Sequence, residues 1–324
     1  MNQVMKALEY VRDGMFVPSE LTKEIISKMK VGKNKSILVL FSYEMLPVLC
    51  ELGYGNVTLV VDNVKPVVYH VAKYYGYNVM TFEEIEEMKF DVVLGNPPYQ
   101  DTKEDGSRKS KTVNLWSKFI SVGMNISKSN GFVAMITPTS WTSPSSDVRG
   151  DYTVDGNTRL WDVFNSYSTY ANVNDVAKHF KGVGSTFGYF IVDKSKHDGL
   201  KFSDGADTSL GFLPKSNFEE VREKLSNENN IGNKYEVTHD NRKLLRVSIP
   251  KTRVLNKDSI EILDAGSEPS VGKNSKGMHL FIYVDTKKEA EHVKKKLIEA
   301  IDVLNIHCRW SGFINIQAVK MIKL

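Results

Sequence analysis

The chain of 324 residues has little cysteine and no long apolar run. Its two cysteines, Cys50 and Cys308, cannot form the disulfide framework of a small secreted domain. Its longest apolar runs, such as residues 37–41 and 132–136, fall far short of the ~20 residues that a membrane-spanning helix needs. The start of the chain lacks the pattern of a secretory signal. We therefore expect a folded protein without a membrane partner, in the cytoplasm of a bacterium or, for a viral protein, of its host.

The chain also lacks a large net charge of either sign and several sequence motifs of known catalytic or metal sites. It carries 43 Lys and Arg against 39 Asp and Glu, a formal net charge of +4, which permits a polyanionic partner without requiring one. It has no G-x-x-x-x-G-K-[ST] motif for nucleotide phosphates and no G-x-S-x-G nucleophile motif. Its 7 histidines and 2 cysteines show no metal-ligand spacing, so no metal site is expected.

Short β-rich runs alternate with helical runs up to about residue 195. The expected strands are residues 36–41, 57–61, 78–80, 90–95, 131–137 and 186–192, and the expected helices are residues 20–29, 44–52, 66–75, 82–88 and 113–127. The strand runs are apolar blocks, which is typical of strands buried on both faces. The pattern therefore predicts an α/β fold, with a Rossmann-like, mostly parallel sheet that has helices on both faces. The helix over residues 20–29 is expected to pack on the sheet edge.

The character of the sequence changes after about residue 195 to shorter, lysine-rich segments. They predict a smaller C-terminal α+β region, whose last helix, residues 287–304, has an apolar stripe formed by Ala290, Val293, Leu297, Ile301 and Leu304. A chain of this length predicts two domains or one large one. We expect one domain over residues 1–200, including the N-terminal helix, and a second over residues 201–324.

Two polar stretches, residues 100–111 and 139–157, follow expected strands directly. Both are expected as long loops at the carboxyl edge of the sheet, where open α/β folds bind ligands. The first of them comes directly after the sequence DVVLGNPPYQ, residues 91–100. These two loops and the segment between strand and loop are therefore the first place to look for a site.

Asn96-Pro97-Pro98-Tyr99 terminates the strand in a rigid direction, because two prolines fix their own φ and cannot continue a sheet ladder. The side chain of Asn96 and the carbonyl of Pro97 then offer two acceptors to the two hydrogens of a planar amino group. Such placement aims the nitrogen at an electrophilic methyl group and accelerates the reaction mainly by positioning. The ring of Tyr99 offers a face on which an extruded base can stack, a contact worth ~1–3 kcal/mol in single-strand systems.

This motif and its strand context resemble the amino-methyltransferases that use S-adenosylmethionine, in particular restriction-modification methylases that act on N6 of adenine in DNA. The resemblance extends unevenly over residues 15–195 and implies the order cofactor motif, catalytic motif, C-terminal target recognition. It implies double-stranded DNA as substrate, extrusion of the target adenine, and an enzyme that works alone or beside a separate restriction endonuclease. Residues 136–141, ITPTSW, resemble the strand end that walls the base pocket, and residues 113–119 resemble the helix after the catalytic loop.

The resemblance assigns roles to individual residues. It implies that Asn96, Pro97, Pro98 and Tyr99 form the catalytic site, that Phe180 stacks on the other face of the base with Phe187 as its nearest competitor, that Phe41, Asp62, Phe82 and Asn96 contact the cofactor, and that Arg108, Lys109 and Lys111 contact DNA phosphates. Asp62 is equally well read as a turn or helix cap, Phe180 and Phe187 as core residues, and the basic loop as solvated.

The sequence departs from the family at the cofactor site. After the first strand it reads Phe41-Ser42-Tyr43-Glu44-Met45, where the family has a glycine-rich turn. Before the catalytic strand it reads Met80-Thr81-Phe82, so the carboxylate that meets the adenine of the cofactor is missing unless Glu83 or Glu84 supplies it. These departures leave open a non-catalytic nucleic-acid-binding protein with a degenerate cofactor site. A methyltransferase acting on RNA or on a protein glutamine also stays open, because such enzymes share the Asn-Pro-Pro-Tyr motif.

Overall fold

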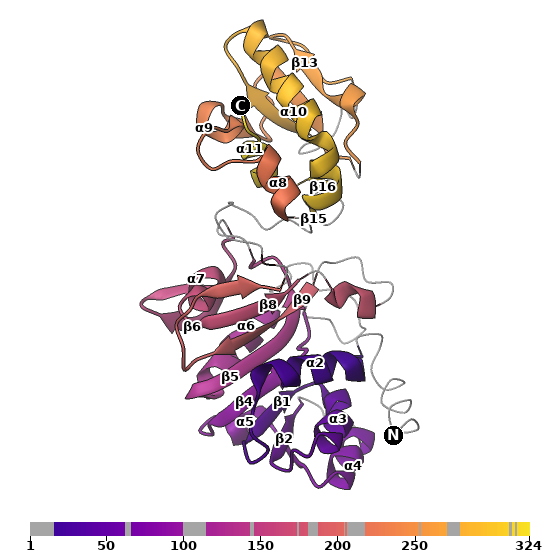
Figure 1. Cartoon of the computed structure of the whole chain (residues 1–324), viewed down its shortest axis with the longest axis vertical. Coiled ribbons are helices and arrows are strands. Elements are labelled where there is room, and N and C mark those ends of the chain that lie inside the picture. The colour runs from indigo at the N-terminus through magenta and orange to yellow at the C-terminus, as the bar shows by residue number, and fades with distance from the viewer. Residues whose placement is uncertain are drawn as a thin grey trace. The chain divides into compact units, whose positions relative to one another are not determined.

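The computed structural model describes residues 16–61, 66–99, 115–142, 146–173, 175–180, 187–203, 205, 218–252, 254–270, 279–310, 313–314 and 316–324. The chain divides into unit 1, residues 1–141 and 146–203, and unit 2, residues 142–145 and 204–324 (Figure 1). Each unit has its own hydrophobic cluster, and the two clusters share no residue. No helix among the described residues is long and apolar enough to cross a membrane.

An eight-stranded mixed sheet in the order β10-β8-β9-β5-β4-β1-β2-β3 forms the centre of unit 1. Its strands are β1 (Ile37–Leu40), β2 (Val57–Val60), β3 (Asn78–Met80), β4 (Phe90–Gly95), β5 (Ser127–Pro138), β8 (Ser168–Asn172), β9 (Phe187–Asp193) and β10 (Leu200–Phe202). Strands β1 to β5 are parallel, whereas β9 is antiparallel to β5 and β8. The six strands expected from the sequence are confirmed, and the order β3-β2-β1-β4-β5 is that of a Rossmann-like sheet, so the predicted fold class is correct.

Helices cover both faces of this sheet. They are α2 (Ser19–Met29), α3 (Leu46–Glu51), α4 (Pro66–Tyr74), α5 (Phe82–Ile85), α6 (Leu115–Ile126) and α7 (Leu160–Asn165), with the 3-10 turns η1 (Tyr43–Met45) and η2 (Val176–His179). Alternate residues of each strand point to opposite faces, so Ile37 and Val39 join the cluster that includes α2, α3 and α4. On the other face α6 packs closely, because a Cβ on Gly123 would lie 3.2 Å from the side chain of Val133.

Helix α2 lies over an interior strand and not at the sheet edge, so that expectation is wrong. Its Glu24 accepts a 2.6 Å hydrogen bond from the hydroxyl of Tyr189 on β9. Strand β9 sits between β5 and β8 within the sheet. The apolar residues of α2, including Leu21 and Ile25, are buried in the same cluster as Tyr189. Burial of this apolar stripe fixes the helix on the face of the sheet.

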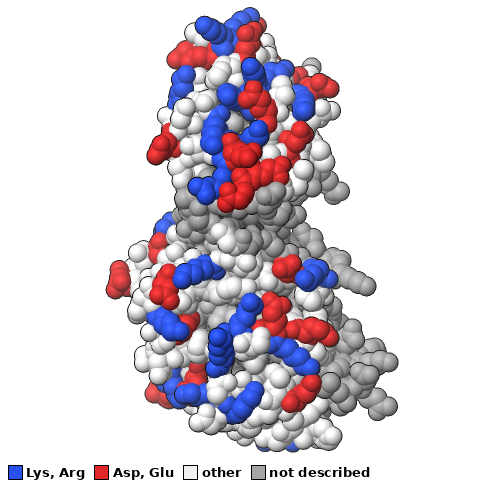
Figure 2. All heavy atoms as spheres, viewed as in Figure 1, with Lys and Arg blue, Asp and Glu red and all other residues white. Residues whose placement is uncertain are grey.

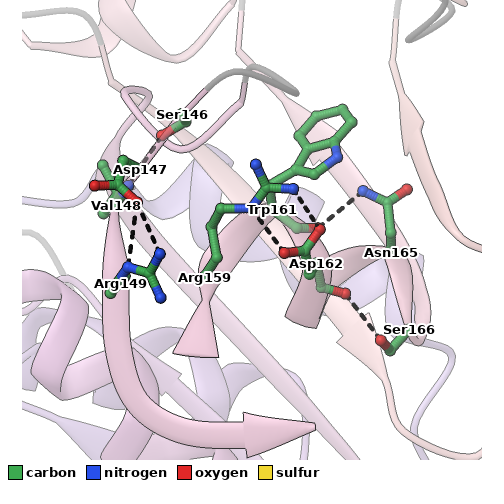
Figure 3. A network of polar contacts seen from close by, with 9 residues as sticks. All are labelled: Ser146, Asp147, Val148, Arg149, Arg159, Trp161, Asp162, Asn165 and Ser166. Carbon is green, nitrogen blue, oxygen red and sulfur yellow. Dashed lines mark hydrogen bonds and ion pairs between the residues drawn. The ribbon is translucent and has the colours of Figure 1, made fainter. Parts of the chain in front are cut away.

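The expectation of a long loop over residues 139–157 is also partly wrong. Strands β6 (Arg149–Val154) and β7 (Asn157–Arg159) form a hairpin, whose turn residues Asp155 and Gly156 have φ of 49° and 79°. Such Asp-Gly turns suit the twist of a two-residue hairpin. A polar network holds the hairpin to α7 (Figure 3): the guanidinium of Arg159 donates through two nitrogens to Asp162, each at 2.7 Å.

Unit 2 is an α+β unit, as expected from the sequence. Its four-stranded antiparallel sheet has the order β11-β14-β12-β13, from β11 (Val237–Thr238), β12 (Arg246–Pro250), β13 (Glu261–Leu263) and β14 (His279–Tyr283). Its helices are α8 (Phe218–Lys224), α9 (Ile231–Lys234), α10 (Lys287–His307) and α11 (Ile316–Lys320), with the 3-10 turn η3 (Lys257–Ser259) and the short pair β15 (Arg309–Trp310) and β16 (Phe313–Ile314). Every residue of the stripe predicted on α10 is buried in the core of this unit.

Candidate active site

The candidate site lies where the strand order of the sheet reverses, between β1 and β4. In open α/β sheets this switch point forms a crevice at the carboxyl ends of the strands, and ligands bind there. The pairing of Leu40 with Gly95 brings the ends of the two strands together. A Cβ on Gly95 would lie 2.9 Å from the carbonyl oxygen of Leu40, so a side chain at this position would push the strands apart. Glycine therefore permits the close approach of β4 to β1. This approach places the next residue, Asn96, beside the turn that follows β1, which we call the β1 turn.

Asn96 and Tyr99 contact each other directly. Asn96 is buried, Pro97 is buried, Pro98 is exposed and Tyr99 is partly buried. The hydroxyl of Tyr99 donates a 2.9 Å hydrogen bond to Oδ1 of Asn96. The sequence predicts Asn96 and Tyr99 in one site, but it gives no indication of this bond between them.

The ring of Tyr99 has an aromatic neighbour in Phe187, the second of the two phenylalanines considered for the other face of the base. Its centroid lies 6.4 Å from that of Phe187 at the start of β9. Phe187 in turn meets Phe180 edge to face at 5.0 Å. Both phenylalanines are buried. Phe187 thus has both Tyr99 and Phe180 as ring neighbours, and the role of either phenylalanine toward a base stays a prediction.

The turn after β1 achieves a glycine-like backbone without glycine. Phe41 has a φ of 61°, in the left-handed region that bulky residues rarely adopt. The amide of Ser42 donates to the carbonyl of Leu40 at 2.8 Å, and the amide of Tyr43 donates to the carbonyl of Phe41 at 3.1 Å. These two bonds, each spanning three residues, define tight γ-type turns. The chain therefore reverses sharply directly after β1, where the sequence contains no glycine.

Three phenylalanine rings gather beside this turn. The ring of Phe41 lies 5.6 Å from that of Phe82 on α5 and 4.8 Å from that of Phe119 on α6, and Phe82 and Phe119 are 6.0 Å apart. We call these residues the phenylalanine cluster. The structure thus brings together Phe41 and Phe82, which the sequence assigns to one site. It adds Phe119, whose only signal in the sequence is its position on the helix that follows the catalytic loop.

Ser42 joins the β1 turn to the catalytic segment. Its buried hydroxyl accepts a 2.7 Å hydrogen bond from the amide of Asn96 and donates a 3.2 Å bond to the carbonyl of Leu40. The sequence analysis missed this residue. The signal that could have found it is topological, because parallel strands that pair in the sheet place the residues after their ends side by side.

Carboxylates near the site already have structural partners. The buried side chain of Glu44 accepts a 3.2 Å hydrogen bond from the amide of Val17. Glu84 accepts from the amide of Thr81 at 2.7 Å, which closes the capping box of α5. Hydrogen bonds from its own backbone and from Thr81 lower the pKa of the exposed Glu83. Of the two carboxylates considered for the cofactor adenine, Glu84 is therefore engaged as a cap.

Other expected site residues differ in what the structure says of them. Asp62, Arg108, Lys109 and Lys111 lie outside the described residues. Trp141, at the end of ITPTSW, is buried, and its indole nitrogen donates to the hydroxyl of Thr137 at 3.2 Å. Its ring packs edge to face on Phe164 at 4.5 Å. Trp141 thus contributes to the core on the α7 side of the sheet.

Comparison with known protein families finds a match for one segment of the chain. Residues 65–157 match the family of the Eco57I restriction-modification methylase, and this segment contains Asn96 and Tyr99. The family match thus covers the part of the chain that contains the candidate site. No curated protein shows significant similarity to the chain in sequence.

Solved structures similar to the chain include several methyltransferases. One is a Listeria monocytogenes protein assigned as a class I S-adenosylmethionine-dependent methyltransferase, with 13% identity and a TM-score of 0.43 over 62% of this chain and 72% of that one. Another is the O-methyltransferase of Bacillus cereus in complex with S-adenosylhomocysteine, with 12% identity and a TM-score of 0.40 over 59% and 89%. The M protein of the type I restriction enzyme EcoKI shows 10% identity and a TM-score of 0.40 over 58% of this chain and 48% of its own length. The chain thus spans about half of that M protein.

Proposed function

We propose that the chain is a DNA methyltransferase that transfers the methyl group of S-adenosylmethionine to N6 of an adenine extruded from double-stranded DNA. The observation that carries this proposal is the Asn96-Pro97-Pro98-Tyr99 segment at the carboxyl end of β4, inside the segment that matches the methylase family. The segment follows the strand at the switch point of the sheet, where a ligand crevice is expected.

In this proposal Asn96 and Pro97 orient the amino group. Oδ1 of Asn96 and the carbonyl oxygen of Pro97 accept its two hydrogens, so that its lone pair faces the methyl group. Oδ1 has two lone pairs, so it can accept from the amino group while keeping the bond from Tyr99. The amino nitrogen that Asn96 and Pro97 hold would release one proton to solvent when it accepts the methyl group. Tyr99 supports the adenine by stacking.

The residues around the β1 turn fit the cofactor. The phenylalanine cluster supplies apolar surface for an adenine ring through Phe41, Phe82 and Phe119, and the positive φ of Phe41 gives the tight turn that the family builds with glycine. Asp62, at the end of the second strand, is proposed to bind the ribose hydroxyls. When bound, S-adenosylmethionine supplies an electrophilic methyl group.

The proposed DNA partner requires contacts beyond the base pocket. Phe180 or Phe187 would cover the other face of the extruded base, Arg108, Lys109 and Lys111 would contact phosphates, and unit 2 would recognise the target sequence. On the face shown in Figure 2, basic and acidic side chains are interspersed over both units. We therefore propose that phosphate binding depends on local groups such as the loop after Tyr99, and that the enzyme acts alone or beside a separate endonuclease.

Methyl transfer from radiolabelled S-adenosylmethionine tests the function directly. The native protein and Asn96→Ala are incubated with double-stranded DNA, RNA and a protein extract, and the labelled base is identified by chromatography. The proposal expects N6-methyladenine in DNA, formed by the native protein more than about a hundredfold faster than by Asn96→Ala. Label in RNA or in protein glutamine would assign the other substrate classes. No transfer together with no calorimetric heat at millimolar cofactor would indicate a non-catalytic protein.

A further inference from the structure

We propose that Ser42 is a positioning residue for the methyl transfer, because its buried hydroxyl fixes the backbone from which Asn96 projects. The proposal rests on the function proposed above, since it assigns Ser42 a task in that reaction. Ser42 does not reach a substrate. It acts through Asn96. Its side chain belongs to the turn after β1 and bonds the first residue of the catalytic segment.

The geometry around Ser42 carries the proposal. Its side chain is fully buried at the switch point, directly after β1, and Asn96 lies directly after the neighbouring strand β4. Its Oγ accepts from the amide of Asn96 at 2.7 Å and donates to the carbonyl of Leu40 at 3.2 Å. A hydroxyl that both donates and accepts is fixed in rotation, so its acceptor lone pair is aimed at the amide. The first peptide after β4 is thereby tied to the last residue of β1.

The bond between the amide of Asn96 and Ser42 controls the position of the side-chain carbonyl oxygen, Oδ1, of Asn96. The amide of Asn96 lies beyond the last β1–β4 ladder pair, Leu40 with Gly95, so the sheet itself does not hold it. Without the hydroxyl, the peptide between Gly95 and Asn96 gains freedom to rotate and Oδ1 moves with it. A displacement of about 1 Å from the reactive geometry is enough to cost on the order of a hundredfold in rate.

The chain contains a matched control for the loss of such a bond. Ser121 on α6 is also buried, accepts a 2.7 Å bond from the amide of Asp151 and donates a 3.1 Å bond to the carbonyl of Ser117. The two serines thus make the same pair of bonds at nearly the same distances, and Ser121 holds the β6 strand to α6. Replacing either serine by alanine removes one hydroxyl and its bond to one backbone amide.

The first experiment compares Ser42→Ala with Ser121→Ala in methyl transfer to DNA. We expect both variants to lose similar thermal stability, while only Ser42→Ala lowers kcat, by about tenfold to a hundredfold, with a smaller change in KM for the cofactor. Ser42→Cys, whose sulfur is a weaker acceptor, should fall between Ser42→Ala and the native protein and provides a second variant if Ser42→Ala folds poorly. An unchanged kcat in both Ser42 variants, or an equal loss of kcat in Ser121→Ala, overturns the proposal.

The second experiment repeats Ser42→Ala in the Asn96→Ala background. The bond from Ser42 is to the backbone amide, so it persists in Asn96→Ala. Ser42→Ala should therefore cost the same stability in both backgrounds, but should change the residual rate of Asn96→Ala by less than about twofold. A rate loss of equal size in both backgrounds would show that Ser42 acts by a route other than Asn96.

Hydrogen exchange separates failure of this inference from failure of the proposed function. The amide of Asn96 should exchange slowly in the native protein and at least about tenfold faster in Ser42→Ala, whatever reaction the protein catalyses. Protection in the native protein without any methyl transfer would reject the proposed function. An active native protein whose Asn96 amide exchanges equally fast in both forms would reject the role of Ser42.

Discussion

Asn96 is the residue on which the proposed chemistry depends most. It is buried at the end of β4, and its amide and its Oδ1 are held by Ser42 and Tyr99 respectively. We expect Asn96→Ala to lower methyl transfer by more than about a hundredfold, since it removes an acceptor that aims the amino group. Cofactor affinity, measured by calorimetric titration, should change much less than methyl transfer, because Asn96 is only one of the residues expected to contact the cofactor. A proportional loss of thermal stability and activity would instead indicate a structural turn residue.

Tyr99 gives a second prediction at this scale, which the structure sharpens. Stacking alone would leave Tyr99→Phe fully active, because stacking uses the ring face. The 2.9 Å bond to Oδ1 of Asn96 adds an orienting role for the hydroxyl. We therefore expect Tyr99→Phe to lower kcat by about twofold to tenfold, from the ~0.5–1.5 kcal/mol of one hydrogen bond.

Tyr99→Ala serves as the comparison, because it removes both the ring and the hydroxyl. Its kcat, measured in the same assay, should fall well below that of Tyr99→Phe. If the two variants are equally impaired, the stacking role of the ring is wrong.

The sequence indicates some site residues far better than others. Asn96 and Tyr99 are visible because two prolines after an apolar strand leave few conformations for the chain. Ser42 and Phe119 are not visible, because their roles depend on which strands and helices become neighbours. The positive φ of Phe41 is equally hidden, since a bulky residue at this position argues against the turn that it forms.

At the scale of elements, the backbone conformation of the β1 turn predicts that glycine is more stabilising than alanine at position 41. In most backbone conformations glycine is less stabilising than alanine, but at positive φ the order reverses. We expect Phe41→Gly to be more stable than Phe41→Ala by about 1 kcal/mol, while both lose the ring contacts with Phe82 and Phe119. Urea denaturation of the two variants measures the difference. A more stable alanine variant would show that Phe41 is not left-handed in solution.

At the amino ends of the strands, opposite the candidate site, one carboxylate bonds several neighbours. It belongs to Asp91, at the start of β4. It accepts from the amide and hydroxyl of Ser36 at 3.0 and 2.8 Å, from Lys128 at 2.9 Å and from Lys35 at 3.2 Å. Burial raises its pKa, but these bonds outweigh burial and hold the pKa well below its usual range. Asp91 thereby ties the starts of β1, β4 and β5 together.

Asp91→Asn should therefore lower the free energy of unfolding at pH 7 by about 2–3 kcal/mol, the size of hydrogen bonds to a charged group. The folded carboxyl has the lower pKa, so its contribution is complete above the unfolded pKa of about 4 and is lost as the pH falls below it. Urea titrations should show the difference between native protein and variant shrinking progressively as the pH falls below about 4, toward the lower pKa of the folded carboxyl. Asp175→Asn, which breaks an exposed pair with Lys178, is the control and should change little at either pH.

The elements that the sequence predicts and those it misses differ in one physical respect. Strands β1, β2, β4 and β9 and residues 132–136 of β5 are largely buried apolar blocks, so composition alone indicates them. Strand β8 reads STYAN and strand β6 reads RGDYTV, with polar residues throughout. Such strands form because a neighbouring strand or turn offers them hydrogen-bond partners, and that partner is not visible in the local sequence.

At the scale of the whole molecule, two separate cores imply two folding units. The hydrophobic cluster of unit 1 runs from Val17 to Ile191 in sequence, and that of unit 2 from Val221 to Ile322. We expect calorimetry to show two unfolding transitions. A fragment that ends at residue 203 should retain a cooperative transition, reported by the buried Trp116, Trp141 and Trp161. A single transition lost in the fragment would show that the units depend on each other.

The fixed conformation of Phe41 in the sharp turn after β1 also affects the entropy change when a ligand binds there. A glycine loop samples many conformations and must lose them when a ligand binds. Here the bonds from Ser42 and Tyr43 and the rings of Phe82 and Phe119 already hold Phe41 in place. The conformational entropy of this turn is therefore given up during folding and not during binding. Association at this end of the sheet should accordingly show a smaller entropic penalty than in relatives with a glycine loop, even where its enthalpy is modest.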